Sequence, residues 1–192
     1  AVFAHAILVK GDDEEHYVAD LVASDVAFMG HTRLIITTDN EPALRKLATV
    51  ALERIRCQVG QDDPTVEQIS SEQSAGYERA SNGGTECGLR TVRGLFRTIT
   101  RCTEKRIGQD VPATHPISSW LLEHVCVILN AMNVGDDGTT ACKRLRGRDF
   151  GHRLIGFLES VFYTQPPNGP QHDVGGNMAP IMFPGSCLGH HH

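Results

Sequence analysis

The sequence predicts an α/β fold, and three observations support this prediction. The 192 residues, of which 40% are hydrophobic and 21% charged, suit one globular domain with a buried core. Short apolar runs rich in β-branched residues alternate with segments whose apolar residues recur at helical spacing. Glycines and prolines separate many of these segments. Strands that alternate with helices indicate a sheet with helices packed against it.

The first strand and the first helix are predicted within the first 30 residues. Residues 1–10, AVFAHAILVK, form a short apolar run followed by a glycine, which is typical of a strand. Residues 12–30 begin with DDEE and continue with apolar residues near helical spacing. Acids are favourable beside the N-terminal dipole of a helix, and Gly30 predicts its C-terminal end.

A second strand and a second helix follow at once. Residues 33–38, RLIITT, predict a β-branched strand, and Asp39 stands at its end. Pro42 suits the first position of a helix, and the apolar residues after it give that helix one hydrophobic face. Residues 58–80 are polar and without a clear period, so we expect a long loop there.

Two more helices are predicted in the middle of the chain. The stretch SNGGTE precedes the first, with Ser81 or Asn82 as its N-cap. Pro116 begins the second, which runs to residue 132. We expect Trp120 to be a core anchor on this helix, together with its leucines, valine and isoleucine.

The remaining residues predict smaller elements. After the turn GDDG, residues 139–148 form a short basic helix, and residues 154–164 form one or two strands. We expect three parts in the chain: a core over 1–135, a closing basic segment with short strands over 136–165, and an irregular tail rich in proline and glycine over 166–192.

The charge is distributed unevenly along the chain. Residues 1–78 hold 14 acids and 6 bases, whereas residues 79–192 hold 9 acids and 12 bases. The basic residues gather over 90–106 and 143–153, and such local stripes bind phosphates even in a chain of net charge −5. Six cysteines without CxxC spacing argue against a zinc module, so we expect reduced, mostly packed thiols in an intracellular protein.

A column of arginines follows one acid on the helix after residue 82. At about 100° per residue, one face carries Glu86, Arg90, Arg93, Arg97 and Arg101. The other side carries Leu89, Val92, Leu95, Phe96, Ile99 and Cys102. Arginines pitched along a helix can follow a nucleic-acid backbone. The alternative is a solvated helix face with one Glu–Arg pair, worth roughly a few tenths of a kcal/mol.

Two short motifs resemble the retroviral-type integrase core in its retrotransposon form. TTDNEPAL (37–44) resembles its second acidic motif, where an Asp ends a strand, and SNGGTE (81–86) resembles the third, where a Glu begins a long helix. HPISSWLLEHVCVILN, VGDDGTTACKRLRGRDF and GNMAPIMFPGSCLGHH resemble later parts of the same polyproteins. The resemblance covers nearly the whole chain and implies a ribonuclease-H-like sheet flanked by helices.

The resemblance also implies the roles of individual residues. Asp39 and Glu86 match the catalytic carboxylates that hold metal ions, and Arg90 and Arg93 match positions that face DNA. Arg97 and Arg101 continue that DNA-binding face. The supporting residues within the two motifs are Asn40, Asn82 and Gly83.

The family performs two-metal phosphoryl transfer, normally with Mg²⁺ and also with Mn²⁺. The first catalytic Asp of the family bridges the ions from a strand that precedes the first strand of this chain, and the acids of GDDEE (11–15) do not replace it. We therefore expect an integrase core without its first strand, inactive as given in strand transfer. The absent strand leaves an open sheet edge, which favours self-association into a homo-oligomer.

The expected function is DNA integration, with retroelement ends and target DNA as partners, inside the cell and in the nucleus in the functional context. No membrane partner is expected, because no apolar run approaches the roughly 20 residues that a spanning helix needs. The alternative is a non-catalytic nucleic-acid-binding or structural remnant of a retrotransposon polyprotein.

Overall fold

The computed structural model describes residues 1–7, 10–11, 14–31, 33–39, 41–59, 68–73, 83–164 and 182–188. These residues form five helices and four strands. In chain order they are α1 (Tyr17–Met29), β1 (Arg33–Thr38), α2 (Pro42–Val59), β2 (Gln68–Gln73), α3 (Gly83–Ile107), α4 (Ile117–Met132), α5 (Ala141–Arg146), β3 (Ser160–Thr164) and β4 (Met182–Ser186). The mixed α/β class predicted from the sequence is confirmed.

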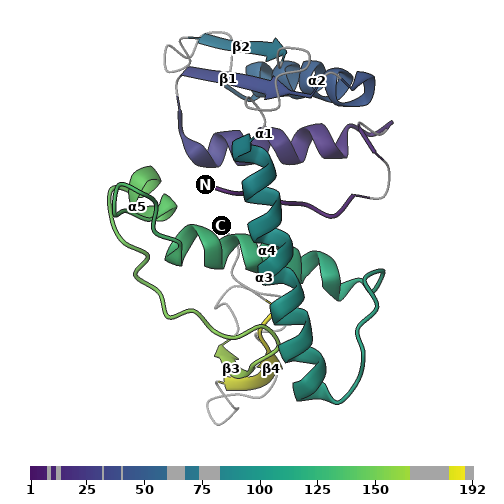
Figure 1. Ribbon diagram of the computed structural model, residues 1–192, viewed down its shortest axis with the longest axis vertical. Coiled ribbons are helices and arrows are strands. Elements are labelled where there is room, and N and C mark those ends of the chain that lie inside the picture. The colour runs from purple at the N-terminus through teal and green to yellow at the C-terminus, as the bar shows by residue number, and fades with distance from the viewer. Residues whose placement is uncertain are drawn as a thin grey trace, which may run out of the picture.

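The strands form two separate two-stranded sheets rather than one sheet flanked by helices. β1 and β2 are parallel, with Leu34 opposite Ile69, and α2 connects them and packs against both. β3 and β4 are antiparallel, with Phe162 opposite Pro184. Figure 1 shows the sheets at opposite ends of the long axis, with α1, α3 and α4 between them.

The core between the two sheets is made by α3, α4 and the segment after α5. Val92 of α3, Leu121 and Val125 of α4, and Phe157 form its buried centre, each no more than 5% exposed. Burying such side chains contributes roughly 1.5–3 kcal/mol each. A second contact joins α1 to α2, which carries the β1–β2 sheet (Figure 1).

Several predicted element ends are confirmed. α1 ends at Gly30, whose φ of 66° is a left-handed conformation that suits glycine. β1 covers the predicted strand, and α2 begins at Pro42. α1 itself begins later than predicted, at Tyr17, because His16 adopts a left-handed φ of 61°. The acids at 14–15 therefore precede the helix and do not lie in its first turn.

The predicted strand over residues 1–10 is wrong for residues 1–7. This part of the chain passes between α1 and α4 without joining either sheet (Figure 1). The backbone N–H of Val2 donates to Oδ1 of Asn130 at 2.7 Å, and Nδ2 of Asn130 donates to the carbonyl of Val2 at 2.8 Å. The Asn130 amide thus provides the backbone partners that a neighbouring strand would otherwise supply.

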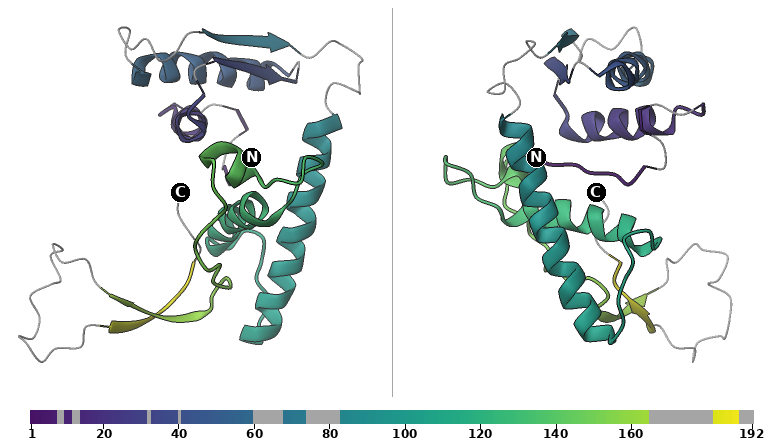
Figure 2. Two further views of the ribbon diagram at one scale, coloured as in Figure 1. Left: turned by 90° about the vertical axis from the view of Figure 1, so that its left-hand side faces the viewer. Right: turned by 45° about the vertical axis from the view of Figure 1, so that its right-hand side comes forward.

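Two strands lie where the sequence predicted none. β2 lies within the expected loop at 58–80, and β4 lies within the expected irregular tail. β2 carries one large apolar residue, Ile69, so its own pattern is weak, and pairing with β1 stabilises it. Residues 154–164 contain the single strand β3, and Figure 2 shows that β3 and β4 project from the helical part.

Single residues also correct the sequence analysis. Trp120 lies in the first turn of α4 and is 41% exposed, so it is not a core anchor. The prediction of mostly packed thiols is confirmed only in part among the described residues, where Cys142 and Cys187 are half-buried. Cys126 is buried, whereas Cys87 and Cys102 are exposed.

Candidate nucleic-acid interface

The interface is built on α3, which has one apolar side and one basic side. Val92 is 5% exposed, and Leu95, Phe96 and Ile99 pack against the core as predicted. The prediction was wrong for two residues of that side, because Leu89 is 48% exposed and Cys102 is exposed. The first turns of α3 extend beyond α4 towards the layer of β1, β2 and α2 (Figure 1).

Three arginines form the open part of the basic side. Arg90, Arg93 and Arg97 are exposed, and no carboxylate of the described residues forms an ion pair with them. A helical rise of about 1.5 Å per residue places neighbouring members about 4.5–6 Å apart along the axis. We call Arg90, Arg93 and Arg97 the open arginine row. Its guanidinium groups repel one another unless an anion lies between them.

Arg101 differs from the row although it continues the same face. Its Nη1 lies 3.2 Å from Oε2 of Glu104, and the two side chains are 82% and 13% exposed. The other oxygen of Glu104 accepts the backbone N–H of Val111 at 3.1 Å. Glu104 therefore fastens the end of α3 to the following loop and offsets part of the Arg101 charge.

Glu86 lies in the first turn of α3, as predicted, and is exposed. A carboxylate there is stabilised by the helix dipole. It forms no ion pair with Arg90, so the simple pair of the alternative interpretation is not formed. Gly83 begins the helix and is also exposed. The supporting residues Asn40 and Asn82 lie outside the described residues.

Asp39 directly follows β1, as predicted, and is exposed. It therefore lies at the carboxyl end of a parallel strand pair, the edge where α/β proteins commonly bind ligands. However, α3 packs against α4 and makes no contact of similar extent with β1 or β2. The structure brings Glu86 and the arginines together on one helix and places Asp39 on a separate unit.

The donor groups for a metal are sparse in the described part of the chain. No group of three or more His, Cys, Asp or Glu side chains there could hold a metal ion. Asp39 and Glu86 belong to elements that do not pack on each other. The described residues thus do not assemble a ligand set for two Mg²⁺ ions.

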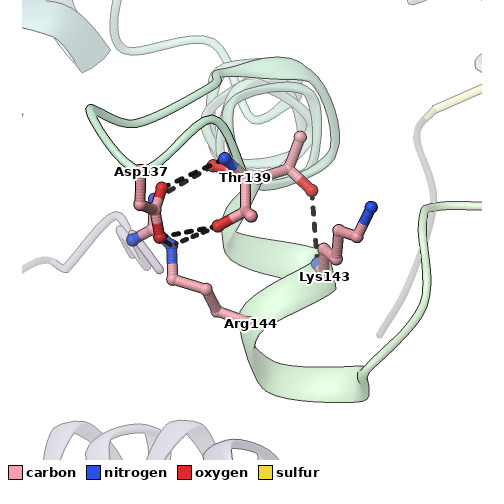
Figure 3. Close-up of polar contacts among 5 residues, drawn as sticks. Asp137, Thr139, Lys143 and Arg144 are labelled. Carbon is pink, nitrogen blue, oxygen red and sulfur yellow. Dashed lines mark hydrogen bonds and ion pairs between the residues drawn. The ribbon is translucent and has the colours of Figure 1, made fainter.

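The second basic cluster, around α5, is partly engaged in ion pairs within the protein. Nε of Arg144 lies 3.0 Å from Oδ2 of Asp137, and Thr139 donates to the same carboxylate from its backbone N–H and its hydroxyl (Figure 3). The Thr139 hydrogen bonds, helped by Arg144, lower the pKa of Asp137. Lys143 pairs with Asp149 at 3.3 Å. Two of the cluster's cations are therefore occupied.

Comparison with known proteins adds no assignment. No protein-family model matches this chain, and no curated protein matches it either. Among the described helices, none is both long and apolar enough to cross a membrane.

Proposed function

We propose that this chain is a ribonuclease-H-like integrase core of a retroelement polyprotein, and that it binds DNA through the open arginine row. The motifs around Asp39 and Glu86 support the family, since one follows a strand and the other begins a long helix, as the resemblance implies. The open arginine row supports DNA as the partner, because three adjacent cations bind a polyanion favourably.

One observation carries the DNA-binding proposal. Arg90, Arg93 and Arg97 are exposed on a helix whose opposite side is buried at Val92, and the described residues offer them no acidic partner. A helix face made only for solubility commonly alternates its charges. An unbroken row of one sign instead suits phosphate groups, which Arg binds with a planar fork.

The catalytic part of the proposal is narrower. If this chain follows the family, Asp39 and Glu86 would each supply carboxylate oxygens to one Mg²⁺ or Mn²⁺ ion. A further carboxylate would bridge the two ions. Asp39 and Glu86 would each hold one metal ion, so neither can also bridge the two ions. We therefore propose that residues 1–192 bind element-end and target DNA without performing strand transfer.

A second candidate is a non-catalytic DNA-binding remnant of the polyprotein. It is favoured by the packing of α3 on α4 rather than on β1, which leaves Asp39 and Glu86 on separate units. An assay separates the candidates. The remnant should not gain DNA joining when an upstream strand with an Asp is fused before Ala1, whereas an integrase core should gain it with Mg²⁺.

The DNA-binding proposal is tested by fluorescence anisotropy with a labelled 30-base-pair duplex. Replacing Arg90 and Arg93 together by Ala should weaken binding and lower the magnitude of the salt slope by about 2, since each phosphate contact contributes roughly 0.9. The matched control replaces Arg45 and Lys46 by Ala. Both lie exposed on α2, and their replacement removes the same charge. Equal effects of both pairs, or no binding by the parent, overturn the proposal.

A further inference from the structure

A second candidate site lies in a cavity of about 410 Å³, away from the open arginine row. Its walls come from α1, α4, α5 and the segment that follows α5. This volume falls within the roughly 300–1,000 Å³ of small-molecule sites in proteins. The residues that define its chemistry are Phe28, Arg146, Arg148, Phe150 and His152.

The cavity has flat aromatic walls. The Cζ atom of Arg146 lies 4.2 Å from the centre of the Phe28 ring, so a cation already stacks on one wall. On another, the rings of Phe150 and His152 lie 5.7 Å apart at an interplanar angle of 72°. Phe150 is only partly buried, so its ring can contact a planar ligand.

The cavity is also positively charged. Among the described residues, no carboxylate forms an ion pair with Arg146 or Arg148. The one acid in the lining, Asp149, is held by Nζ of Lys143 at 3.3 Å. The two guanidinium groups therefore leave net positive charge at the cavity, which favours an anion and repels a cation.

We propose that this cavity binds a nucleotide, with the base against the Phe150 ring and the phosphate beside Arg146 and Arg148. A nucleotide joins a flat π-system to an anion, which are the two features that the lining offers. An aliphatic anion would leave the aromatic walls without a partner, and an uncharged aromatic would leave the cations unneutralised. The proposal does not depend on DNA binding by α3.

The nucleotide has two chemical sources, a free mononucleotide or the terminal nucleotide of a strand. Calorimetric titration with dAMP, deoxyadenosine and inorganic phosphate tests the shared chemistry. We expect dAMP to bind about tenfold more tightly than either fragment, since each lacks one of the two contacts. Tetranucleotides with and without a 5′-phosphate separate the sources, because only the strand-end source predicts binding that requires the 5′-phosphate.

Variants locate the site. Arg148→Gln should weaken dAMP binding about tenfold by removing one charged contact. Phe150→Leu should weaken dAMP and deoxyadenosine alike while leaving phosphate binding unchanged. Arg153→Gln is the matched control, since Arg153 is exposed in the same segment and does not line the cavity. Unaltered melting temperatures exclude misfolding as the cause.

Two results overturn the proposal: dAMP binding no tighter than phosphate, or equal dAMP binding by the parent and Arg148→Gln. A loss of duplex binding on replacing Arg90 and Arg93, with dAMP binding retained, would show that the two sites are separate. If the protein binds the duplex but does not bind dAMP, the nucleotide site is refuted and the proposed DNA binding is unaffected.

Discussion

Asn130 of α4 and Val2 exchange two hydrogen bonds through one side-chain amide, at 2.7 Å and 2.8 Å, across 128 positions of the chain. Asn130 is 8% exposed, so water cannot easily replace these bonds. The pair fixes the N-terminal segment against α4, next to the core.

The first prediction concerns this pair. Asn130→Ala should lower the free energy of unfolding by about 2 kcal/mol, because two hydrogen bonds worth about 1 kcal/mol each are lost. Urea unfolding followed by circular dichroism measures the change. Asn133→Ala, at an exposed position of the same region, is the control and should change little. A loss below about 0.5 kcal/mol at position 130 would show that the N-terminal segment is not held there.

The second prediction concerns pH. Nε2 of His5 lies 2.9 Å from Oδ2 of Asp25, and this hydrogen bond, with the charges of Asp25 and of Glu123 on α4, raises the His5 pKa above 6.5. A proton held more tightly in the folded state stabilises it fully below pH 6.5, and the effect disappears as pH rises through the raised pKa.

His5→Gln should therefore lower the melting temperature most in acid, with a smaller difference from the parent in alkaline buffer. Thermal melts in a series of buffers on both sides of the His5 pKa give the comparison. The control is His115→Gln, at an exposed position in the loop before α4. A difference between parent and His5→Gln that grows towards alkaline pH contradicts the assignment.

The third prediction concerns cysteine reactivity. Burial raises the pKa of the Cys126 thiol to about 11 and keeps it as an unreactive thiol near neutral pH. Cys87 and Cys102 are exposed on α3. Brief treatment of the native protein with iodoacetamide should label Cys87 and Cys102, with Cys126 modified only after denaturation. Peptide mapping by mass spectrometry reads the order, and early labelling of Cys126 would contradict its burial.

The fourth prediction concerns Gly135. A methyl group there would collide with Nη2 of Arg144. The same nitrogen donates to Oδ1 of Asp137 at 3.3 Å (Figure 3). Gly135→Ala should displace Arg144 and cost about 0.5–1 kcal/mol, since both partners are half exposed and such pairs are weak.

When Arg144 is already replaced by Ala, Gly135→Ala should cost little. The Gly135→Ala/Arg144→Ala double variant should therefore be almost as stable as Arg144→Ala alone. Gly151→Ala is the matched control, because the space beside Gly151 is open. Chemical denaturation of the parent, the two single variants and the double variant completes the cycle. Additive losses of unfolding free energy would contradict a collision between position 135 and Arg144.

Local signals in the sequence predicted the elements that depend on few neighbours. Pro42 at the start of α2 and Gly30 at the end of α1 act through their own backbone preferences, so their positions were predictable. The buried side of α3 was predictable from its period around Val92. The same reasoning placed Asp39 at a strand end and Glu86 in a first turn.

Elements that depend on distant partners were not predictable. Residues 1–7 look like a strand, yet Asn130 takes the place of the neighbouring strand. β2 has little pattern of its own and exists through its pairing with β1. The cavity likewise joins Phe28 to Arg146, far apart in the chain, and its one sequence signal was the basic run at 143–153.

The parallel pairing of β1 with β2 has a kinetic consequence. Leu34 comes into register with Ile69 only after the chain has passed through α2, so this sheet closes a long loop before its strands pair. Contacts of long sequence separation form slowly. The parallel pair should therefore form only after α2, so the strand that bears Asp39 depends on this helix to reach its final place.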